Sequence, residues 1–378
     1  MKIVIDDKIP FIRGAFEPFA EVVYLPGART TAQDVRDADG IVTRTRTKCD
    51  ARLLEGSSVR AIASATIGFD HIDTEWCEGH GIAWTNAPGC NSSSVKTYVA
   101  SLLVSLASRR GWDLSAMTLG VVGVGNVGSK VAQVGKALGM KVLLNDPPRE
   151  RREGGEAFRS LEEVMERADI VTLHVPLEKE GPDATWHLFD KERIAALGKS
   201  QYLINASRGP VVDNVALKEA LKEGRIAGAS LDVWENEPDI DPELVALVDF
   251  ATPHIAGYSQ DGKANGTMRS VNWLAGELGL PISSWKAEDV PEPSRPREFC
   301  LDAAGRSAQE VLAEAILHVH RISEDSDALR ADLSAFEHLR GHYPVRRDME
   351  RFTLHLRGGD EELRERFGLL GFSMIIEK

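Results

Sequence analysis

The sequence lacks the features of a membrane-spanning, disulfide-stabilised or nucleic-acid-binding protein. Its four cysteines are scattered and form no C-x-x-C pair, which argues against a disulfide framework or a cysteine zinc site and favours reduced thiols. No apolar run approaches the roughly eighteen residues needed to span a bilayer. Acidic residues outnumber basic ones by 58 to 45, so we do not expect a nucleic-acid surface to be the main function. The cysteines are Cys49, Cys77, Cys90 and Cys300.

The chain instead alternates short apolar strands with helical segments over most of its 378 residues. The N-terminal segment 1–7 meets acidic residues at once, so it indicates a first strand rather than a signal peptide, and we expect a cytoplasmic protein. Apolar strands that alternate with helices predict an α/β fold of parallel sheets covered on both faces. The predicted strands are 3–5, 41–43, 61–63, 142–144, 170–173, 202–204, 229–231 and 250–252.

A glycine-rich turn follows the apolar segment that ends at Val122. Residues 123–128 have the spacing G-x-G-x-x-G, and Asp146 closes the next predicted strand about twenty residues later, as in the dinucleotide-binding fingerprint. Gly123 permits the tight turn, Gly125 allows a pyrophosphate to approach the backbone, and Gly128 allows close helix packing. The helix N-terminus then faces the phosphates. An acidic residue at position 146 favours NAD, because it accepts the ribose hydroxyls and repels the 2′-phosphate of NADP.

These signals predict two Rossmann-like, doubly wound parallel-sheet domains and a small C-terminal α/β domain. We assign residues 1–92 and 258–288 to a substrate-binding domain and residues 93–257 to an NAD-binding domain. Three prolines between positions 291 and 296 predict a linker. Residues 289–378 form the third domain, with helices expected at 307–320 and 329–339 and strands at 352–356 and 372–376.

Three residues near the ends of later predicted strands have the chemistry to oxidise a 2-hydroxy acid. His254 follows the strand 250–252, and an imidazole can take a hydroxyl proton near neutral pH. Glu237 can fix the tautomer of that imidazole, and Arg208 suits the bidentate capture of a carboxylate. Taken singly, each also fits an ordinary role as a loop histidine, a solvated acid or one arginine among many.

The segments around these residues are long and occur in a fixed order. Residues 205–213, 231–238 and 252–256 together resemble the D-isomer-specific 2-hydroxyacid dehydrogenase family. The resemblance implies that Arg208 clamps the substrate carboxylate, that Glu237 orients His254, and that His254 is the acid/base. It also implies a set of cofactor-binding positions beyond Gly123, Gly125, Gly128 and Asp146: Asn126, Val127, Val175, Ala206, Ser207, Asp232 and Gly257.

Nearly the whole chain shows a narrower resemblance, to the erythronate-4-phosphate dehydrogenase family. Residues 86–91, 146–149 and 254–259 carry it, together with the extra C-terminal region. It implies NAD-dependent oxidation of 4-phospho-D-erythronate to 2-oxo-3-hydroxy-4-phosphobutanoate in pyridoxal 5′-phosphate (vitamin B6) biosynthesis. It also implies a homodimer formed through the C-terminal region. Thr45, Thr66 and Tyr258 match its substrate-contacting positions, while Thr97 and Val175 depart from residues that relatives often carry.

A phosphorylated substrate requires cations, and the basic segment 43–48 follows a predicted strand. We expect Arg44 or its neighbours to hold the phosphate, although a solvated basic loop fits equally well; Arg346 and Arg347 are weaker candidates. No metal site is expected, because His318 and His320 do not have the i, i+4 spacing of a helical metal pair. Two alternatives stay open: a 3-phosphoglycerate-type dehydrogenase with a regulatory C-terminal domain, and an NAD-sensing interaction protein such as the C-terminal-binding co-repressors.

Overall fold

The computed structural model describes residues 1–377, which form two compact units. The first unit contains residues 1–91 and 259–292, and the second contains residues 92–258 and the chain from Pro293 onward. The segment 259–292 contains the helix α11 (Gln260–Leu278). This helix packs against a sheet that is formed by the N-terminal residues. Each unit therefore combines segments that are far apart in the sequence.

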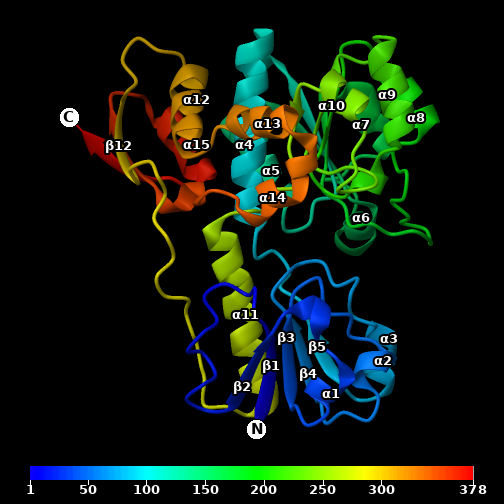
Figure 1. The fold of residues 1–378 in the computed structure, drawn as a ribbon. Coiled ribbons are helices and arrows are strands. Elements are labelled where there is room, and N and C mark those ends of the chain that lie inside the picture. Colours follow the sequence, from blue (N-terminus) through cyan, green and yellow to red (C-terminus); the bar gives the residue numbers. More distant parts are fainter. Residues whose placement is uncertain (378) are drawn as a thin grey trace. The chain divides into compact units, whose positions relative to one another are not determined.

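The first unit is a parallel five-stranded sheet with helices on both faces (Figure 1). On one face, Val271 and Leu274 of α11 pack against Ile3, Ile5 and Val42. On the other face, the short helices α1 (Ala32–Val35), α2 (Ala51–Leu54) and α3 (Thr74–Gly79) cover a second apolar cluster. The strand order is β2 (Glu21–Leu25), β1 (Lys2–Asp6), β3 (Gly40–Thr43), β4 (Ala61–Ser64) and β5 (Ala83–Thr85).

The second unit contains a parallel six-stranded sheet in which the glycine turn follows a central strand. Three of its inner strands, at residues 118–122, 170–173 and 202–205, are buried apart from Thr118 and are mostly apolar, as expected for a sheet with helices on both faces. The order is β11 (Phe250–Ala251), β10 (Gly228–Leu231), β9 (Tyr202–Asn205), β8 (Ile170–Leu173), β6 (Thr118–Val122) and β7 (Lys141–Asn145). The covering helices are α4 (Ser92–Arg110), α5 (Gly128–Ala137), α6 (Pro147–Glu153), α7 (Leu161–Arg167), α8 (Lys191–Ala196), α9 (Asn214–Lys222) and α10 (Pro242–Leu247).

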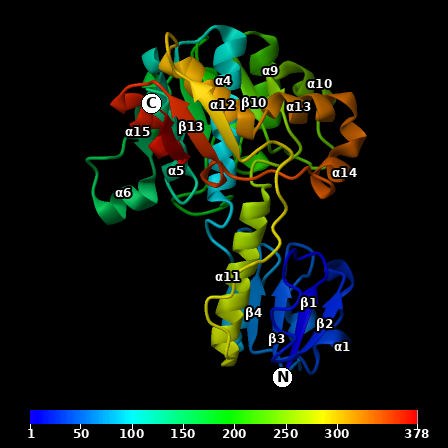
Figure 2. The ribbon, with the colours of Figure 1, turned by 90° about the vertical axis from the view of Figure 1, so that its left-hand side faces the viewer.

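The C-terminal region of the second unit has its own three-stranded parallel sheet, β12 (Glu298–Asp302), β13 (Thr353–Arg357) and β14 (Ser373–Glu377). Its helices α12 (Ala308–Val319) and α15 (Glu361–Leu370) pack against α4 and α5 of the six-stranded part, and Figure 2 shows α12 beside α4. An ion pair between the buried Lys96 and the half-buried Glu350 reinforces this contact, with Lys96 Nζ 2.6 Å from Glu350 Oε1. The region that we expected to form a separate domain thus shares a hydrophobic core with the dinucleotide-binding sheet. The three-domain division stays a prediction.

The sequence pattern did not reveal three strands, β2, β5 and β12, and each lies at the edge of its sheet. Edge strands are partly exposed and so do not show the continuous apolar run of a central strand. The helix expected at 329–339 is interrupted, because the Asp332 side chain accepts a hydrogen bond from Ser334 N between α13 (Ile322–Ala331) and α14 (Phe336–Gly341). No helix within residues 1–377 is long and apolar enough to cross a bilayer.

Candidate active site

The glycine turn has the local geometry that each of its glycines requires. Gly123 has a φ of +83°, and a Cβ on it would lie 2.6 Å from His174 O. A Cβ on Gly128 would lie 1.8 Å from Gly123 O, so only glycine lets α5 begin this close to the turn. Gly125 has open space around it and is exposed together with Asn126, while Val127 precedes α5. The turn therefore leaves its backbone accessible where a pyrophosphate would bind.

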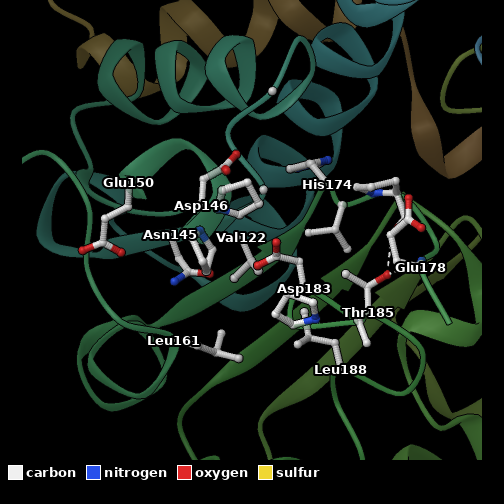
Figure 3. Close-up of a pocket in the computed structure, with 18 of the residues that line it drawn as sticks. Val122, Asn145, Asp146, Glu150, Leu161, His174, Glu178, Asp183, Thr185 and Leu188 are labelled. Atoms are coloured by element: carbon white, nitrogen blue, oxygen red, sulfur yellow. Dashed lines mark hydrogen bonds between the residues drawn. The ribbon is translucent and has the colours of Figure 1, made fainter. Parts of the chain in front are cut away.

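Asp146 ties this turn to the strand that follows it. Its Oδ2 accepts a hydrogen bond from Val124 N at 2.8 Å, and its Oδ1 caps α6 by accepting from Arg149 N at 2.9 Å. Each carboxylate oxygen keeps a further lone pair for a ribose hydroxyl. Asp146, Val175 and His174 line a cavity of about 820 Å³ next to the glycines (Figure 3). A cavity of this size at the carboxyl ends of parallel strands fits a dinucleotide.

The ring of His174 lies beside this cavity with its Nε2 3.0 Å from Thr172 Oγ1, while its buried Nδ1 has no hydrogen-bond partner within the described chain. Burial lowers the pKa of His174 to about 3. In an unfolded chain the same side chain titrates near 6.5. Below pH 6.5 the unfolded state therefore binds a proton that the folded state does not, and the free energy of unfolding falls as the pH falls.

His174→Gln is therefore expected to flatten the pH dependence of stability. Between pH 6.5 and pH 5 the loss from His174 amounts to about 2 kcal/mol, at about 1.4 kcal/mol for each pH unit. Urea unfolding at the two pH values measures this difference, with the exposed His342→Gln as a matched control. An unchanged pH dependence in His174→Gln would mean that His174 titrates alike in both states.

Asp232, expected near the nicotinamide, uses its carboxylate to organise the loop that follows β11. The carboxylate is almost fully buried and accepts hydrogen bonds from Thr252 Oγ1 (2.7 Å), Ile255 N (2.8 Å) and Ala256 N (2.9 Å). Gly257 directly follows this loop. Ala206 and Ser207 follow β9, where Ser207 N and Oγ both donate to Asn205 Oδ1. These loops lie at the same edge of the sheet as the glycine turn.

The structure brings Glu237 and His254 into direct contact. Glu237 Oε2 lies 2.7 Å from His254 Nδ1, and its Oε1 accepts a hydrogen bond from Trp234 N at 2.9 Å. Burial raises the pKa of Glu237, but the hydrogen bond and charge of His254, the Trp234 N–H and the Arg340 cation together lower it below its usual value. Glu237 is thus an anion that holds the imidazole through Nδ1, which leaves Nε2 directed to other groups.

Arg208 lies on a loop that abuts the segment carrying Glu237. A Cβ on Gly209 would lie 1.8 Å from Trp234 O, so the loop after Arg208 can approach this closely only with glycine. The guanidinium is half-buried and donates one hydrogen bond, from Nη1 to Ser207 O at 2.7 Å. Its other N–H groups remain for a planar anion. Arg208, Glu237 and His254 all belong to the second unit and follow β9, β10 and β11.

A second histidine–glutamate pair, which no local sequence signal indicated, supports the segment that carries Glu237. His187 Nε2 lies 2.8 Å from Glu235 Oε1, and Glu235 Oε2 accepts from Asn214 N at 2.9 Å. In return, Asn214 Oδ1 accepts from Glu235 N at 3.2 Å. Because Glu235 is two residues before Glu237, these contacts fix the backbone from which Glu237 projects.

The expected substrate-contacting residues divide between the two units. Thr45, Thr66 and Arg44 belong to the first unit, and Tyr258 belongs to the second. Thr45 is exposed, and Thr66 Oγ1 lies 2.9 Å from Ser64 Oγ. Arg44 is half-buried and donates from Nη1 to Lys8 O at 3.2 Å, which leaves most of its guanidinium for other partners.

Two arginines of the C-terminal region lie next to the catalytic residues, a position that local sequence signals do not indicate for either of them. The Arg340 guanidinium lies 5.7 Å from the ring centre of Tyr258. Arg346 was a candidate phosphate ligand, but its buried guanidinium instead donates to the backbone carbonyls of Ile255 and Ala256. These contacts do not favour Arg346 as a phosphate ligand, and that interpretation stays a prediction. No cluster of three or more metal-ligating side chains occurs in the described part of the chain.

The comparisons with known proteins agree with this geometry. Residues 94–256 match the D-isomer specific 2-hydroxyacid dehydrogenase family, in its NAD binding domain. Erythronate-4-phosphate dehydrogenase of Bacteroides fragilis is 49% identical over 349 residues, which are 92% of this chain and 97% of the relative. The chain belongs to the erythronate-4-phosphate dehydrogenase family. The family member of Pseudomonas entomophila is 42% identical, with 99% of each chain covered.

A solved structure has a fold similar to that of this chain. D-lactate dehydrogenase from Aquifex aeolicus, complexed with NAD and lactic acid, is 28% identical, with a TM-score of 0.60. The match covers 74% of this chain and 97% of that chain. The fold expected from the sequence, an α/β fold with Rossmann-like parallel sheets, is confirmed.

Proposed function

We propose that this chain catalyses the NAD-dependent oxidation of 4-phospho-D-erythronate to 2-oxo-3-hydroxy-4-phosphobutanoate, a step of pyridoxal 5′-phosphate biosynthesis. The observation that carries the chemistry is the 2.7 Å contact between Glu237 and His254, next to the Arg208 loop at the carboxyl edge of an NAD-binding sheet. The substrate is supported by relatives named for it that match nearly the whole chain. We expect the enzyme to act in the cytoplasm.

The chain's own residues perform the proton transfer and hold the substrate. His254 Nε2 accepts the proton of the C2 hydroxyl, and Glu237 stabilises the imidazolium that forms. Arg208 holds the carboxylate by paired hydrogen bonds, which orients C2 toward the cofactor. Bound NAD would supply the acceptor for the hydride of C2. In the reverse direction His254 returns the proton.

An assay of NADH formation with a panel of acids tests this function. We expect turnover of 4-phosphoerythronate to exceed that of 3-phosphoglycerate and of unphosphorylated erythronate. Faster turnover of 3-phosphoglycerate would instead support the phosphoglycerate-type dehydrogenase. NADH binding without turnover of any of these acids would support the NAD-sensing interaction protein.

We propose that Arg44 binds the distal phosphate, with Thr45, Thr66 and Tyr258 in the substrate site. Arg44→Ala is expected to raise the KM for 4-phosphoerythronate by about 10- to 100-fold, the usual effect of losing a hydrogen bond to a charged group. The KM for unphosphorylated erythronate should not change. Steady-state kinetics measure both, with the exposed Arg52→Ala as the control. An unchanged KM for the phosphorylated acid would remove Arg44 from this role.

The cofactor-binding residues are proposed from the same geometry. Gly123, Gly125, Asn126, Val127 and Gly128 would surround the pyrophosphate. Asp146 would accept the ribose hydroxyls with the lone pairs that Val124 and Arg149 leave free, which favours NAD over NADP. Further positions would surround the rest of the cofactor: Val175, Ala206, Ser207, Asp232 and Gly257.

We also propose that the chain forms a homodimer through its C-terminal region. Three large apolar side chains of this region are 38–48% exposed, Leu369, Ile375 and Ile376. Two of them lie on β14, an edge strand of the three-stranded sheet. Apolar side chains gathered at a sheet edge are typical of a surface that another chain covers. A solution mass of about twice 41.4 kDa would support the dimer, and the mass of a single chain would contradict it.

A further inference from the structure

The backbone of the catalytic loop, which we define as residues 254–256, is held in an unfavourable conformation. His254 has a φ of 56°, in the left-handed region that a side chain with a Cβ rarely adopts. Such a conformation is strained and persists only where the surroundings enforce it. The direction of the imidazole therefore depends on the groups that hold this loop.

Asp232 holds the loop from one side. Its backbone carbonyl accepts the N–H of His254 at 2.7 Å, and its carboxylate accepts the N–H groups of Ile255 and Ala256. All three N–H groups of the catalytic loop are thus bound to a single buried residue. This leaves the carbonyl groups of the loop to other partners.

Arg346 of the C-terminal region binds two of those carbonyls, of which Ile255 O also accepts the Tyr258 N–H at 2.8 Å. Its Nη2 donates to Ile255 O at 3.1 Å and to Ala256 O at 2.5 Å. Only 4% of Arg346 is exposed, so water does not compete for these bonds. Both the N–H and the C=O of Ile255 and Ala256 are therefore held by charged side chains, Asp232 on one side and Arg346 on the other.

Arg346 is itself fixed by a network of buried and half-buried side chains. Its Nη1 lies 3.4 Å from Tyr343 Oη, which donates to Asp325 Oδ2 at 2.8 Å. The same carboxylate oxygen lies 2.9 Å from His320 Nε2. Burial raises the pKa of Asp325, but its contacts with His320, Tyr343 and Arg346 lower it overall. Asp325 is therefore an anion that offsets the buried guanidinium.

We propose that Arg346 is a positioning residue: by clamping the carbonyls of the catalytic loop, it keeps the His254 imidazole in line with Glu237 and the substrate hydroxyl. The C-terminal region then contributes to turnover as well as to assembly. Because this role rests on the dehydrogenase reaction proposed above, its test needs one readout of the reaction and one of the loop itself.

Three variants separate positioning from general stability. Arg346→Met removes the donors but keeps the aliphatic bulk, and Arg346→Lys keeps a charged donor. Arg330→Met is the matched control, because Arg330 of α13 also donates to backbone carbonyls of the six-stranded part, from Nη2 to Val248 O at 2.5 Å and Asp249 O at 3.5 Å. That clamp lies before β11 and does not touch the catalytic loop.

We expect Arg346→Met to lower kcat by about 10- to 100-fold, the scale of a small misplacement of a catalytic group, with the Kd for NADH changed by less than about 3-fold. Arg346→Lys should restore part of the loss, and Arg330→Met should keep kcat within about 2-fold of the unchanged chain. An Arg346→Met kcat equal to that of the unchanged chain would overturn the proposal. So would an equal loss in Arg330→Met, because the effect would then be one of general stability.

Amide hydrogen exchange of the peptide spanning residues 252–258 tests the clamp independently of any substrate. Arg346→Met should accelerate exchange at Ile255 and Ala256, and Arg330→Met should not; unchanged exchange in Arg346→Met would overturn the clamp even in an active enzyme. If Arg346→Met does not fold, Tyr343→Phe takes its place in the test. We expect Tyr343→Phe to exchange the Ile255 and Ala256 amides faster and to have a kcat about 3- to 10-fold lower than the unchanged chain. If Tyr343→Phe changes neither quantity, the proposal fails. If the unsubstituted chain showed no dehydrogenase activity but its Ile255 and Ala256 amides were protected from exchange, the proposed function would be contradicted and the clamp would not.

Discussion

His254→Asn is expected to lower kcat by about 10²- to 10⁴-fold while the chain stays folded and binds NADH. Asparagine tolerates the left-handed backbone that this position requires, so the substitution removes the titrating ring without adding strain. It also removes the partner that Glu237 holds at 2.7 Å. Steady-state kinetics with 4-phosphoerythronate and NAD measure the loss.

The exposed His80→Asn serves as the control for this substitution and should retain full activity. The Kd for NADH, measured by fluorescence, should be similar in both variants, because the cofactor cavity does not include His254. A His254→Asn enzyme with a kcat within about 10-fold of the unchanged chain would contradict the assignment of His254 as acid/base.

Arg208→Met is expected to lower kcat/KM by about 30- to 5000-fold, which corresponds to about 2–5 kcal/mol for removing one partner of a buried charge pair. The substrate carboxylate would lose its planar partner, and the two loops that meet at Gly209 and Trp234 would keep their contact. The kcat/KM of Arg208→Lys should lie between that of Arg208→Met and that of the unchanged chain, because an ammonium group has the charge of a guanidinium but cannot form its paired hydrogen bonds.

The exposed Arg167→Met, which disrupts only an i, i+4 ion pair with Glu163, is the matched control for Arg208 and should be neutral. If Arg208→Met acted through cofactor binding or product release, its Kd for NADH would differ from that of the unchanged chain. If Arg208→Lys were as active as the unchanged chain, bidentate capture of the carboxylate would not be the role of Arg208.

The dinucleotide-binding part of the fold was predictable because its signals are local. Buried parallel strands are continuous apolar runs, and the glycines at 123 and 128 have no substitute where a Cβ would meet backbone atoms. The same holds for His254, Glu237 and Arg208, which directly follow strands or lie in ordered motifs. Local signals of this kind predict the backbone conformation of the glycine turn. They also predict which edge of the sheet carries the catalytic side chains.

The contribution of the C-terminal region was not predictable in the same way. Arg346 is about ninety positions from the loop that it clamps, and nothing in its own neighbourhood distinguishes it from a surface arginine. The buried Lys96 and the half-buried Glu350 likewise form an ion pair across a long sequence separation. Such contacts depend on tertiary packing, so neither the spacing of apolar residues nor a local motif predicts them. The pairing of His187 with Glu235 is missed for the same reason.

The most direct test of the central claim follows the hydrogen at C2. The full-length chain is incubated with NAD and 4-phosphoerythronate that carries deuterium at C2, and the reduced cofactor is analysed by mass spectrometry. We predict that the reduced nicotinamide gains one deuterium for each molecule of 2-oxo acid formed. Reduced cofactor without deuterium, or no reduced cofactor at all, would contradict hydride transfer from C2 of this substrate.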